Sequence, residues 1–586
     1  MPRKKLFVVI IAAVFALIGI ILAVYLITKG NTDTSVEDSV TGINVEYLSD
    51  EYSLDNATYI TAENGNISID GSGASVKSQA LTISNKGVYV LSGDFADGIT
   101  IDARGAAVYI VLNNANITNS NGACIYAKSV DTLYLASMSN TTNTLADGED
   151  YSENYGTEDV DAAVYSKGNL ALIGDGKIEI VSNHYHGIHS KDYLQVLSGE
   201  YLVSAIRNGV MGKDYVAIKD GTLNITSGND GIKSNQDTDT KLGYIVINGG
   251  NITVNATGDA IHAETRISIS GGALNLTTGG GAKITSTNQE WGRWGGTSNA
   301  NSESNTSTKG IKAEKYILID GGNITLNTSD DAIHSNTNVV INNGNIAINS
   351  GDDGIHADSN LIVNNGNVDI AQSYEGIEAE SITVNDGNIS VVASDDGFNA
   401  AGGNDSSSIN GRAGRNNFGG NGVGSLTFNG GTVYVNSTGD GLDSNNSITI
   451  TGGYITVDGP TNNGNGALDH DGNMLISGGT LIAAGSSGML ELPSISSTQN
   501  SICIVFSSTP SANTEFTLKD ANGNTIVSYT PSKQYASIIV SMPEIATNAS
   551  YTAYTGDSTV GNITVTNTVT SYGGNSGGMN RGGMRR

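Results

Sequence analysis

A short phrase, Asp-Gly-Ile-His-Ala in its clearest form, returns along the chain every 21 to 22 residues, and this repeat restricts the fold more than any other feature. The copies that begin at Asp331, Asp353, Glu375 and Asp396 follow one another without insertions. Each copy is followed by apolar residues that alternate around a turn, which is typical of β-strands. A repeat of three short strands cannot bury its apolar face alone, so we predict that successive repeats stack as coils of a parallel β-solenoid.

The apolar residue of the phrase predicts a ladder of inward-facing side chains. Its positions are Ile125, Val164, Ile188, Val210, Ile232, Ile261, Ile311, Ile333, Ile355, Ile377, Phe398, Leu442 and Leu468. The chain is therefore predicted to be all-β, a right-handed parallel β-helix of about thirteen coils and about 60 Å in length. The frames of leucine-rich repeats and of nonapeptide calcium-binding repeats are both absent.

The segments outside the repeat predict the domain organisation. Arg3, Lys4 and Lys5 precede an uncharged, mostly apolar run from Leu6 to Ile27, which is long enough to span a membrane. We predict a cytoplasmic stub and transmembrane helix over 1–29, with the rest of the chain at the cell surface; a cleaved signal peptide is the alternative. A linker over 30–52, the β-helix over 53–492, a small C-terminal β domain over 493–568 and a disordered tail over 569–586 are expected to follow.

Irregular spacing predicts three loops inserted at the edge of the solenoid, at 139–161, 279–308 and 402–424. The two cysteines, Cys124 and Cys503, are too few for a disulfide framework. The chain carries 58 acidic and 29 basic residues, a formal net charge of -29. Such a surface repels nucleic acid and attracts cations, so we expect no nucleic-acid partner.

Stacking would place the acidic residues of the phrase in columns along the turns. Carboxylates that crowd every few ångströms repel one another unless a cation lies between them, and several oxygen ligands suit Ca²⁺. The predicted calcium ligands are Asp230, Asp259, Asp330, Asp331, Asp352, Asp353, Glu375, Asp395, Asp396, Asp440 and Asp443. The structural alternative is that aspartate simply favours tight turns.

The position three residues after the turn residue forms a second outward column, which includes Lys233, His262, Lys312, His334 and His356. Such a row could grip a polymer, hold a catalytic base or form a solvated face. His334, His356 and Glu378 could also bind a transition metal.

Four segments carry a resemblance to a known family: 394–405, 438–444, 459–469 and 478–488. In these segments the chain resembles the clostridial cell-surface carbohydrate-binding β-helix family, which is similar to family 9 pectate lyases. The resemblance covers about residues 47–568 and implies coils that hold calcium and bind plant-type polysaccharides such as cellulose or pectin. It carries no catalytic role onto His334, His356 or Phe398.

Three functions stay open from the sequence. The first is a calcium-stiffened rod that binds polysaccharide without cleaving it. The second is a calcium-dependent polysaccharide lyase or hydrolase, in which the resemblance implies a lysine base and the outward candidates are Lys233 and Lys312. The surrounding negative charge would keep either lysine protonated, so we favour binding without cleavage. The third is an adhesive surface protein that contacts other proteins.

Overall fold

The computed structural model describes residues 42–152, 155–283, 307–400 and 423–573. These residues form β-strands joined by turns and loops, and none of them lies in a helix. None of the described residues therefore provides a helix that could span a membrane. The predicted anchor at 1–29 lies outside the described residues.

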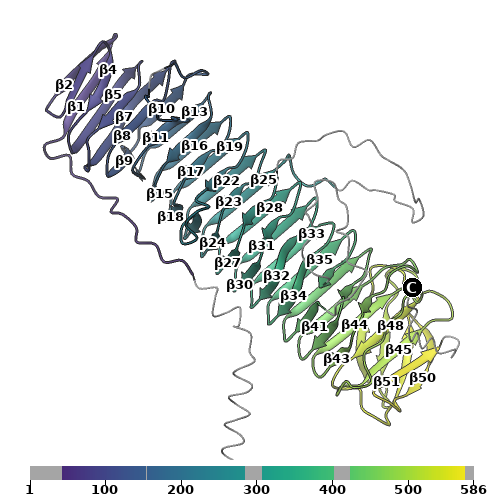
Figure 1. Cartoon of the computed structure of the whole chain (residues 1–586). Coiled ribbons are helices and arrows are strands. Elements are labelled where there is room, and N and C mark those ends of the chain that lie inside the picture. Colours follow the sequence, from purple (N-terminus) through teal and green to yellow (C-terminus); the bar gives the residue numbers. More distant parts are fainter. Residues whose placement is uncertain (1–41, 153–154, 284–306, 401–422, 574–586) are drawn as a thin grey trace, which may run out of the picture. The chain divides into compact units, whose positions relative to one another are not determined.

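Three columns of strands build the body of the unit that starts at Asn44 (Figure 1). The first column contains the repeated phrase and consists of β4 (Ala80–Ile83), β6 (Ile99–Asp102), β8 (Ile125–Ser129), β11 (Ala162–Ser166), β14 (His186–Ser190), β17 (Val210–Gly212), β20 (Ile232–Ser234), β23 (Ile261–Ala263), β26 (Ile311–Ala313), β29 (Ile333–Ser335), β32 (Ile355–Val363), β34 (Ile377–Val384), β36 (Phe398–Ala400), β39 (Leu442–Ser444) and β42 (Leu468–His470).

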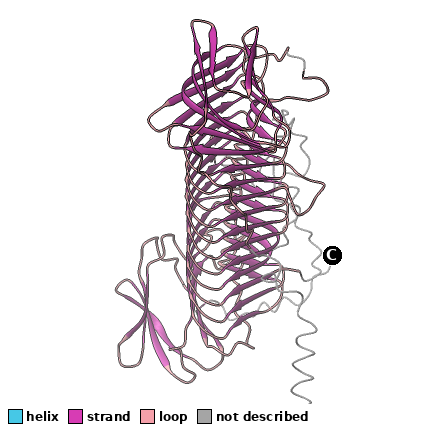
Figure 2. Ribbon diagram, turned by 90° about the vertical axis from the view of Figure 1, so that its left-hand side faces the viewer, coloured by secondary structure: helices cyan, strands magenta, loops and turns pink. Residues whose placement is uncertain are grey.

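The second column contains β9 (Thr132–Ser137), β12 (Asn169–Gly174), β15 (Tyr193–Val196), β18 (Tyr215–Ile218), β21 (Tyr244–Ile247), β24 (Arg266–Ile269), β27 (Tyr316–Ile319), β30 (Asn338–Ile341), the second halves of β32 and β34, β37 (Ser425–Phe428), β40 (Ser447–Ile450) and β43 (Met474–Ile476). The third contains β10 (Thr142–Asp147), β13 (Lys177–Ser182), β16 (Glu200–Ala205), β19 (Thr222–Ser227), β22 (Asn251–Ala256), β25 (Ala273–Thr278), β28 (Asn323–Thr328), β31 (Asn345–Ser350), β33 (Asn367–Gln372), β35 (Asn388–Ala393), β38 (Thr432–Ser437), β41 (Tyr454–Asp458) and β44 (Thr480–Gly485). Each strand of a column pairs in parallel with the strand of the next coil, as in a parallel β-helix, and Figure 2 shows these stacked strands from a second direction.

The predicted ladder of inward side chains is confirmed position by position. The pairing register joins each member to the next, for example Ile311 to Ile333 and Ile333 to Ile355. All thirteen side chains are at most 1% exposed. The structure adds two rungs before them, because Leu81 pairs with Ile99 and Ile99 pairs with Ile125. The right-handed winding stays a prediction.

The first predicted insertion, at 139–161, is partly wrong. Residues Thr142–Asp147 form β10, whose Thr144 pairs with Asn116 of β7 (Ala107–Asn119) and whose Leu145 pairs with Ile180 of β13. This stretch therefore belongs to the third column, and its short alternating pattern was hidden by the irregular spacing around it. The other two predicted insertions lie largely outside the described residues.

Antiparallel pairs close both ends of the stack. At the first end, β1 (Thr58–Glu63) pairs with β2 (Asn66–Asp70), and β3 (Ala74–Lys77) pairs with β4. β1 also pairs in parallel with β5 (Gly87–Phe95), which in turn pairs in parallel with β7. At the other end, β44 pairs antiparallel with β48 (Ser537–Ser541), so the parallel order stops there.

The C-terminal part adds three strands to the large sheet and a small sheet of its own. β48 also pairs with β45 (Ser501–Val505), and β45 pairs with β51 (Val569–Gly573). β51 thus extends the ordered β-structure past the predicted boundary at 568. The second sheet contains β46 (Phe516–Lys519), β47 (Thr525–Tyr529), β49 (Ser550–Thr555) and β50 (Ser558–Thr564).

Two side-chain ladders run along the outside of the second-column strands and the turns after them. Tyr193, Tyr215 and Tyr244 stack ring on ring, with centroids 4.8 and 4.9 Å apart. The segment before β1 lies beside this stack, because the Leu48 amide donates to Gln195 Oε1 at 2.9 Å. Further along, asparagine side chains on successive turns donate to one another, in the order Asn429, Asn385, Asn364, Asn342 and Asp320.

Candidate functional site: charged turn columns and an adjacent cleft

The predicted turn column exists, and its carboxylates bind the backbone of the next coil. Asp230 Oδ1 accepts the amide of Asp259 at 3.1 Å, and Asp331 Oδ1 accepts the amide of Asp353 at 3.1 Å. Asp396 Oδ1 accepts the amide of Asp440 at 2.6 Å. One oxygen of each carboxylate thus has a structural role, which supports part of the turn-residue alternative. The other oxygen remains for a cation or a base.

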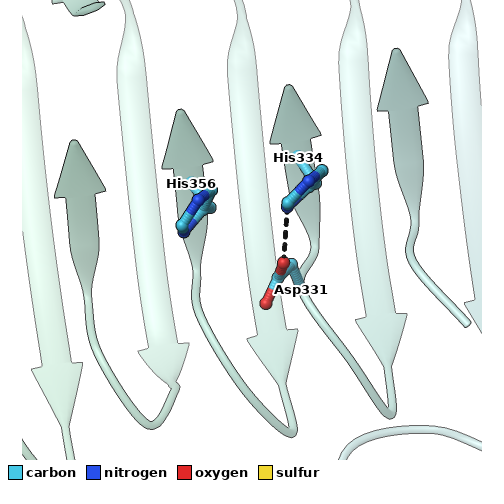
Figure 3. A group of neighbouring side chains, drawn as sticks. All are labelled: Asp331, His334 and His356. Atoms are coloured by element: carbon cyan, nitrogen blue, oxygen red, sulfur yellow. Dashed lines mark hydrogen bonds and ion pairs between the residues drawn. The ribbon is translucent and has the colours of Figure 1, made fainter. Parts of the chain in front are cut away.

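In the first half of the column, from Asp230 to Asp353, basic side chains face that second oxygen. Lys233 Nζ lies 2.8 Å from Asp230 Oδ2. His334 Nδ1 lies 2.7 Å from Asp331 Oδ2, as Figure 3 shows, and His356 Nδ1 lies 3.2 Å from Asp353 Oδ2. The second oxygen of each of these aspartates therefore already has a partner within the chain.

Lys309 replaces aspartate in the turn column and acts as a built-in cation. Its ammonium is buried and lies 3.0 Å from Asp330 Oδ1 and 2.6 Å from Asp331 Oδ2. Burial alone would lower the pKa of Lys309, but the charges of Asp331 and Asp330 outweigh it and raise that pKa. Asp330, Asp331 and Asp352 lie close enough to share a metal ion, yet the lysine already contacts two of them.

Two histidines of the second outward column, His334 and His356, are buried, so a solvated face, one of the alternatives for that column, does not describe them. His334 is 4% and His356 0% exposed, and their rings stack with centroids 4.8 Å apart (Figure 3). Asn336 covers His334, because its Oδ1 lies 2.9 Å from His334 Nε2.

Three carboxylates surround the ring of His356, those of Asp353, Asp358 and Glu378. Burial lowers the pKa of His356, but hydrogen bonds to Asp353, Asp358 and Glu378 outweigh it and raise that pKa well above its usual value. Of the three residues predicted as a possible transition-metal group, His356 and Glu378 are in contact, at 2.9 Å, as an ion pair.

The second half of the column has a different charge balance. Within the part of the chain that the structure describes, Glu375, Asp396, Asp440 and Asp443 form no ion pair with a lysine, arginine or histidine. Burial and neighbouring carboxylates raise the pKa of Asp440 to about 7 and that of Asp443 to about 8. These half-buried carboxylates crowd together without a positive partner.

An orphaned oxygen lies among these carboxylates. Asn399 pairs in register with Glu378 on one side and with Asp443 on the other, and its side chain is 1% exposed. Its amide donates to Glu375 Oε2 at 2.7 Å, but its Oδ1 has no hydrogen-bond partner among the described residues. A buried acceptor beside carboxylates fits an oxygen-coordinated cation such as Ca²⁺.

A cleft of about 510 Å³ opens beside the start of the turn column. It brings together three cations that are far apart in sequence, Lys191, Arg207 and Lys233. Lys312, the other predicted base, does not line this cleft, and its Nζ lies 3.3 Å from Glu314 Oε1.

Two histidines and an aspartate in the cleft were not predicted. His189 Nδ1 lies 2.6 Å from Asp161 Oδ1, and His186 Nδ1 accepts the backbone amide of Asn208 at 3.1 Å. Burial lowers the pKa of His186 to about 4, so its ring is neutral. The signal that could have found them is the phrase His186-Gly-Ile-His189, an early copy of the repeat.

Comparison with known proteins agrees with this description. The fold and the turn columns define an all-β protein of the parallel β-helix type. Residues 77–354 match the family model of carbohydrate-binding domain-containing proteins. This match confirms the predicted resemblance for that segment, which contains the cleft and the first half of the turn column.

Two individual proteins are also similar. A carbohydrate-binding domain-containing protein of Acetivibrio thermocellus is 32% identical over 150 residues, which are 25% of this chain and 52% of that protein. The chain thus spans about half the length of this curated relative. A solved structure, described as a polysaccharide lyase-like protein from C. thermocellum, is 30% identical and covers 38% of this chain and 92% of its own, with a TM-score of 0.37.

Proposed function

We propose that this protein binds acidic polysaccharide in the cleft between Asp161 and Lys233, and that calcium stiffens the coils beyond it. The observation that carries the proposal is the grouping of Lys191, Arg207 and Lys233 in one open cleft on a chain of net charge -29. Cations gathered on an acidic surface suit the carboxylates of a uronate polymer. The match of residues 77–354 to carbohydrate-binding proteins supports the same function.

The ring of Tyr185 adds a feature common in sugar sites. It lies in the cleft with the Arg207 guanidinium 5.4 Å from its centroid, and Tyr185 as a whole residue is 37% exposed. An exposed aromatic face can pack against a sugar ring while the arginine binds its carboxylate. The cleft therefore offers both apolar and ionic contacts to one polymer.

A lyase or hydrolase is the second candidate function, because Lys233 lies in the same cleft as Arg207. A lyase needs a neutral base near the proton that it removes. The Nζ of Lys233 is instead occupied by an ion pair with Asp230 Oδ2 at 2.8 Å. Binding without cleavage is therefore the function that we favour.

The binding proposal is tested by affinity electrophoresis of the full-length chain through gels that contain polygalacturonate or cellulose. We expect retardation by polygalacturonate, and loss of most of it in Arg207→Ala. Arg104→Ala is the matched control, because Arg104 is exposed and does not line the cleft. Equal retardation of both variants would contradict the proposal, and unsaturated product that absorbs ultraviolet light and disappears in Lys233→Ala would favour the lyase.

For calcium, we propose ligands in the second half of the turn column, among Glu375, Asp396, Asn399, Asp440 and Asp443. The uncompensated carboxylates and the orphaned Asn399 Oδ1 support this placement. Calcium that binds only the folded state would raise the melting temperature by mass action.

Calorimetric titration of the calcium-free chain tests this placement. We expect calcium uptake that is weakened by Asp443→Asn and unchanged in Asp230→Asn, whose carboxylate already pairs with Lys233. If the chain takes up no calcium, the aspartates serve only to form the turns. Loss in Asp230→Asn alone would move the ions to the first half of the column.

We also propose that the apolar run Leu6–Ile27 anchors the protein in the membrane and displays the β-helix at the cell surface. Protease treatment of intact cells, followed by immunoblotting, tests this localisation. Degradation of the β-helix only after cell lysis would contradict it.

A further inference from the structure

We propose a transition-metal site at His262, Glu264 and Glu314, none of which lines the cleft or belongs to the oxygen-rich calcium region. His262 belongs to β23, and Glu264 follows this strand directly. Glu314 holds the corresponding position after β26, on the next coil. His262 Nε2 lies 3.9 Å from Glu264 Oε1 and 3.9 Å from Glu314 Oε1.

The nitrogen that faces the two carboxylates lacks a hydrogen-bond partner among the described residues. His262 is 8% exposed, and its Nε2 forms no hydrogen bond within the described part of the chain. A distance of 3.9 Å is too long for a hydrogen bond. Two ligand atoms that each bind one ion at about 2.1 Å lie about 3 to 4 Å apart, so a single ion fits between these atoms with little movement.

The other ring nitrogen is placed as in known metal sites. His262 Nδ1 lies 3.4 Å from Asp230 Oδ2 and 3.5 Å from Asp259 Oδ2. A carboxylate that holds one nitrogen of a histidine directs the other nitrogen toward a metal ion. Lys233 Nζ lies 3.1 Å from the same Nδ1, and a lysine that donated there would leave the ring proton on Nε2. Metal binding therefore requires Lys233 to donate to Asp230 alone, with which it is already paired at 2.8 Å.

The ligand set selects the class of ion. One imidazole nitrogen and two carboxylate oxygens suit Zn²⁺ and related divalent ions, whereas Ca²⁺ prefers oxygen ligands alone. The side chains of Glu264 and Glu314 are 26% and 32% exposed, so solvent can reach the site and supply a further ligand.

Lys312 competes with the proposed ion. Its ammonium lies 3.3 Å from Glu314 Oε1, the oxygen that faces His262. A bound dication would repel this ammonium, which must then turn toward solvent. Removal of the lysine charge should therefore strengthen metal binding.

The test is calorimetric titration of ZnCl₂ into the full-length chain, without a histidine tag and in calcium-saturated buffer. We expect one strong zinc site, weakened by at least about tenfold in His262→Gln, Glu264→Gln and Glu314→Gln. Lys312→Met should bind zinc more tightly. Cobalt gives a second readout, because its visible bands change with nitrogen ligation and should change in His262→Gln.

His334→Gln is the matched control, since His334 lies in the same column but both of its nitrogens already have partners. Zinc affinity should be unchanged in this variant. No strong site in the unmodified chain, or equal affinity in Glu264→Gln, would overturn the proposal. Glu264→Gln serves as a test that does not depend on a buried residue, provided that its melting temperature matches that of the unmodified chain. Loss in His334→Gln alone would assign the ion to Asp331, His334 and His356, and would also overturn it.

Discussion

At the scale of single residues, each turn carboxylate has two functions that are divided between its oxygens. In Asp331, Oδ1 accepts the backbone amide of the next coil while Oδ2 contacts Lys309 and His334. The same geometry with an unpaired second oxygen recurs at Asp396. The residue type at the turn thus serves the fold, and the partner of the second oxygen decides whether a cation is needed.

Lys309 gives the sharpest test of this division. Lys309→Met removes the ammonium that lies between two buried carboxylates, those of Asp330 and Asp331. We expect the free energy of unfolding to fall by about 3 to 5 kcal/mol, measured by urea denaturation. Lys128→Met, which breaks an exposed pair with Asp102, should change it by less than about 0.5 kcal/mol. Similar losses in both variants would contradict the role given to Lys309.

His186 predicts a pH dependence of stability. Its folded-state pKa is lowered from 6.5 to about 4 by burial. Between these values the unfolded chain binds a proton that the folded chain excludes, so stability is complete above about pH 6.5 and falls as the pH drops toward about 4.

Thermal melting between about pH 7 and about pH 4.5 checks this dependence. His186→Asn keeps a polar side chain near the Asn208 amide but cannot titrate, and its melting temperature should fall less with pH. An identical fall in both proteins would mean that other groups cause it.

At the scale of elements, alternation along each strand was enough to predict the inward ladder, because side chains of a strand point to opposite faces in turn. The turn column followed from the same register. The cleft did not, because it depends on how turns of unequal length, such as those before His186 and Arg207, project from neighbouring coils. The hydrogen bond from the Asp353 amide to Asp331 Oδ1 could not be predicted from the sequence either, because it depends on the distance between coils.

The asparagine ladder outside the coils is an element that only the structure shows. Asn364 donates to Asn342 Oδ1 at 2.7 Å and accepts from Asn385 at 2.6 Å. Asn364→Ala should lower the free energy of unfolding by about 1 to 2 kcal/mol, measured by urea denaturation. Asn349→Ala, at an exposed position of β31, should change it by less than about 0.5 kcal/mol. Equal free energies of unfolding in the two variants would show that the asparagine ladder does not stabilise the protein.

At the scale of the whole β-helical unit, the antiparallel strands at the two ends determine where the parallel stack stops. β48 covers the last parallel strand, β44, with five register pairs from Leu481–Ser541 to Gly485–Ser537. An uncovered strand presents unpaired backbone groups that recruit other chains. The cap therefore keeps the stack from continuing into a second molecule.

Disruption of this cap should cause self-association. Ile539→Pro removes a backbone donor from β48, which pairs with both β44 and β45. We expect oligomers that grow with protein concentration in analytical ultracentrifugation. Asn562→Pro, on β50 in the separate small sheet, should not cause self-association. Association of both variants to the same degree would show that general unfolding, rather than an open strand edge, is responsible.

The pairing register also has a consequence for how such a protein can evolve. Ile261 pairs with Ile311 although 49 residues separate them, and Phe398 pairs with Leu442 in the same way across 43 residues. The coils on either side keep their alignment whatever length of chain leaves and returns between them. New segments can therefore be inserted at one edge without any change to the coils that already exist. Entire coils can be duplicated or lost in the same way, so such a protein can evolve by the gain or loss of single coils.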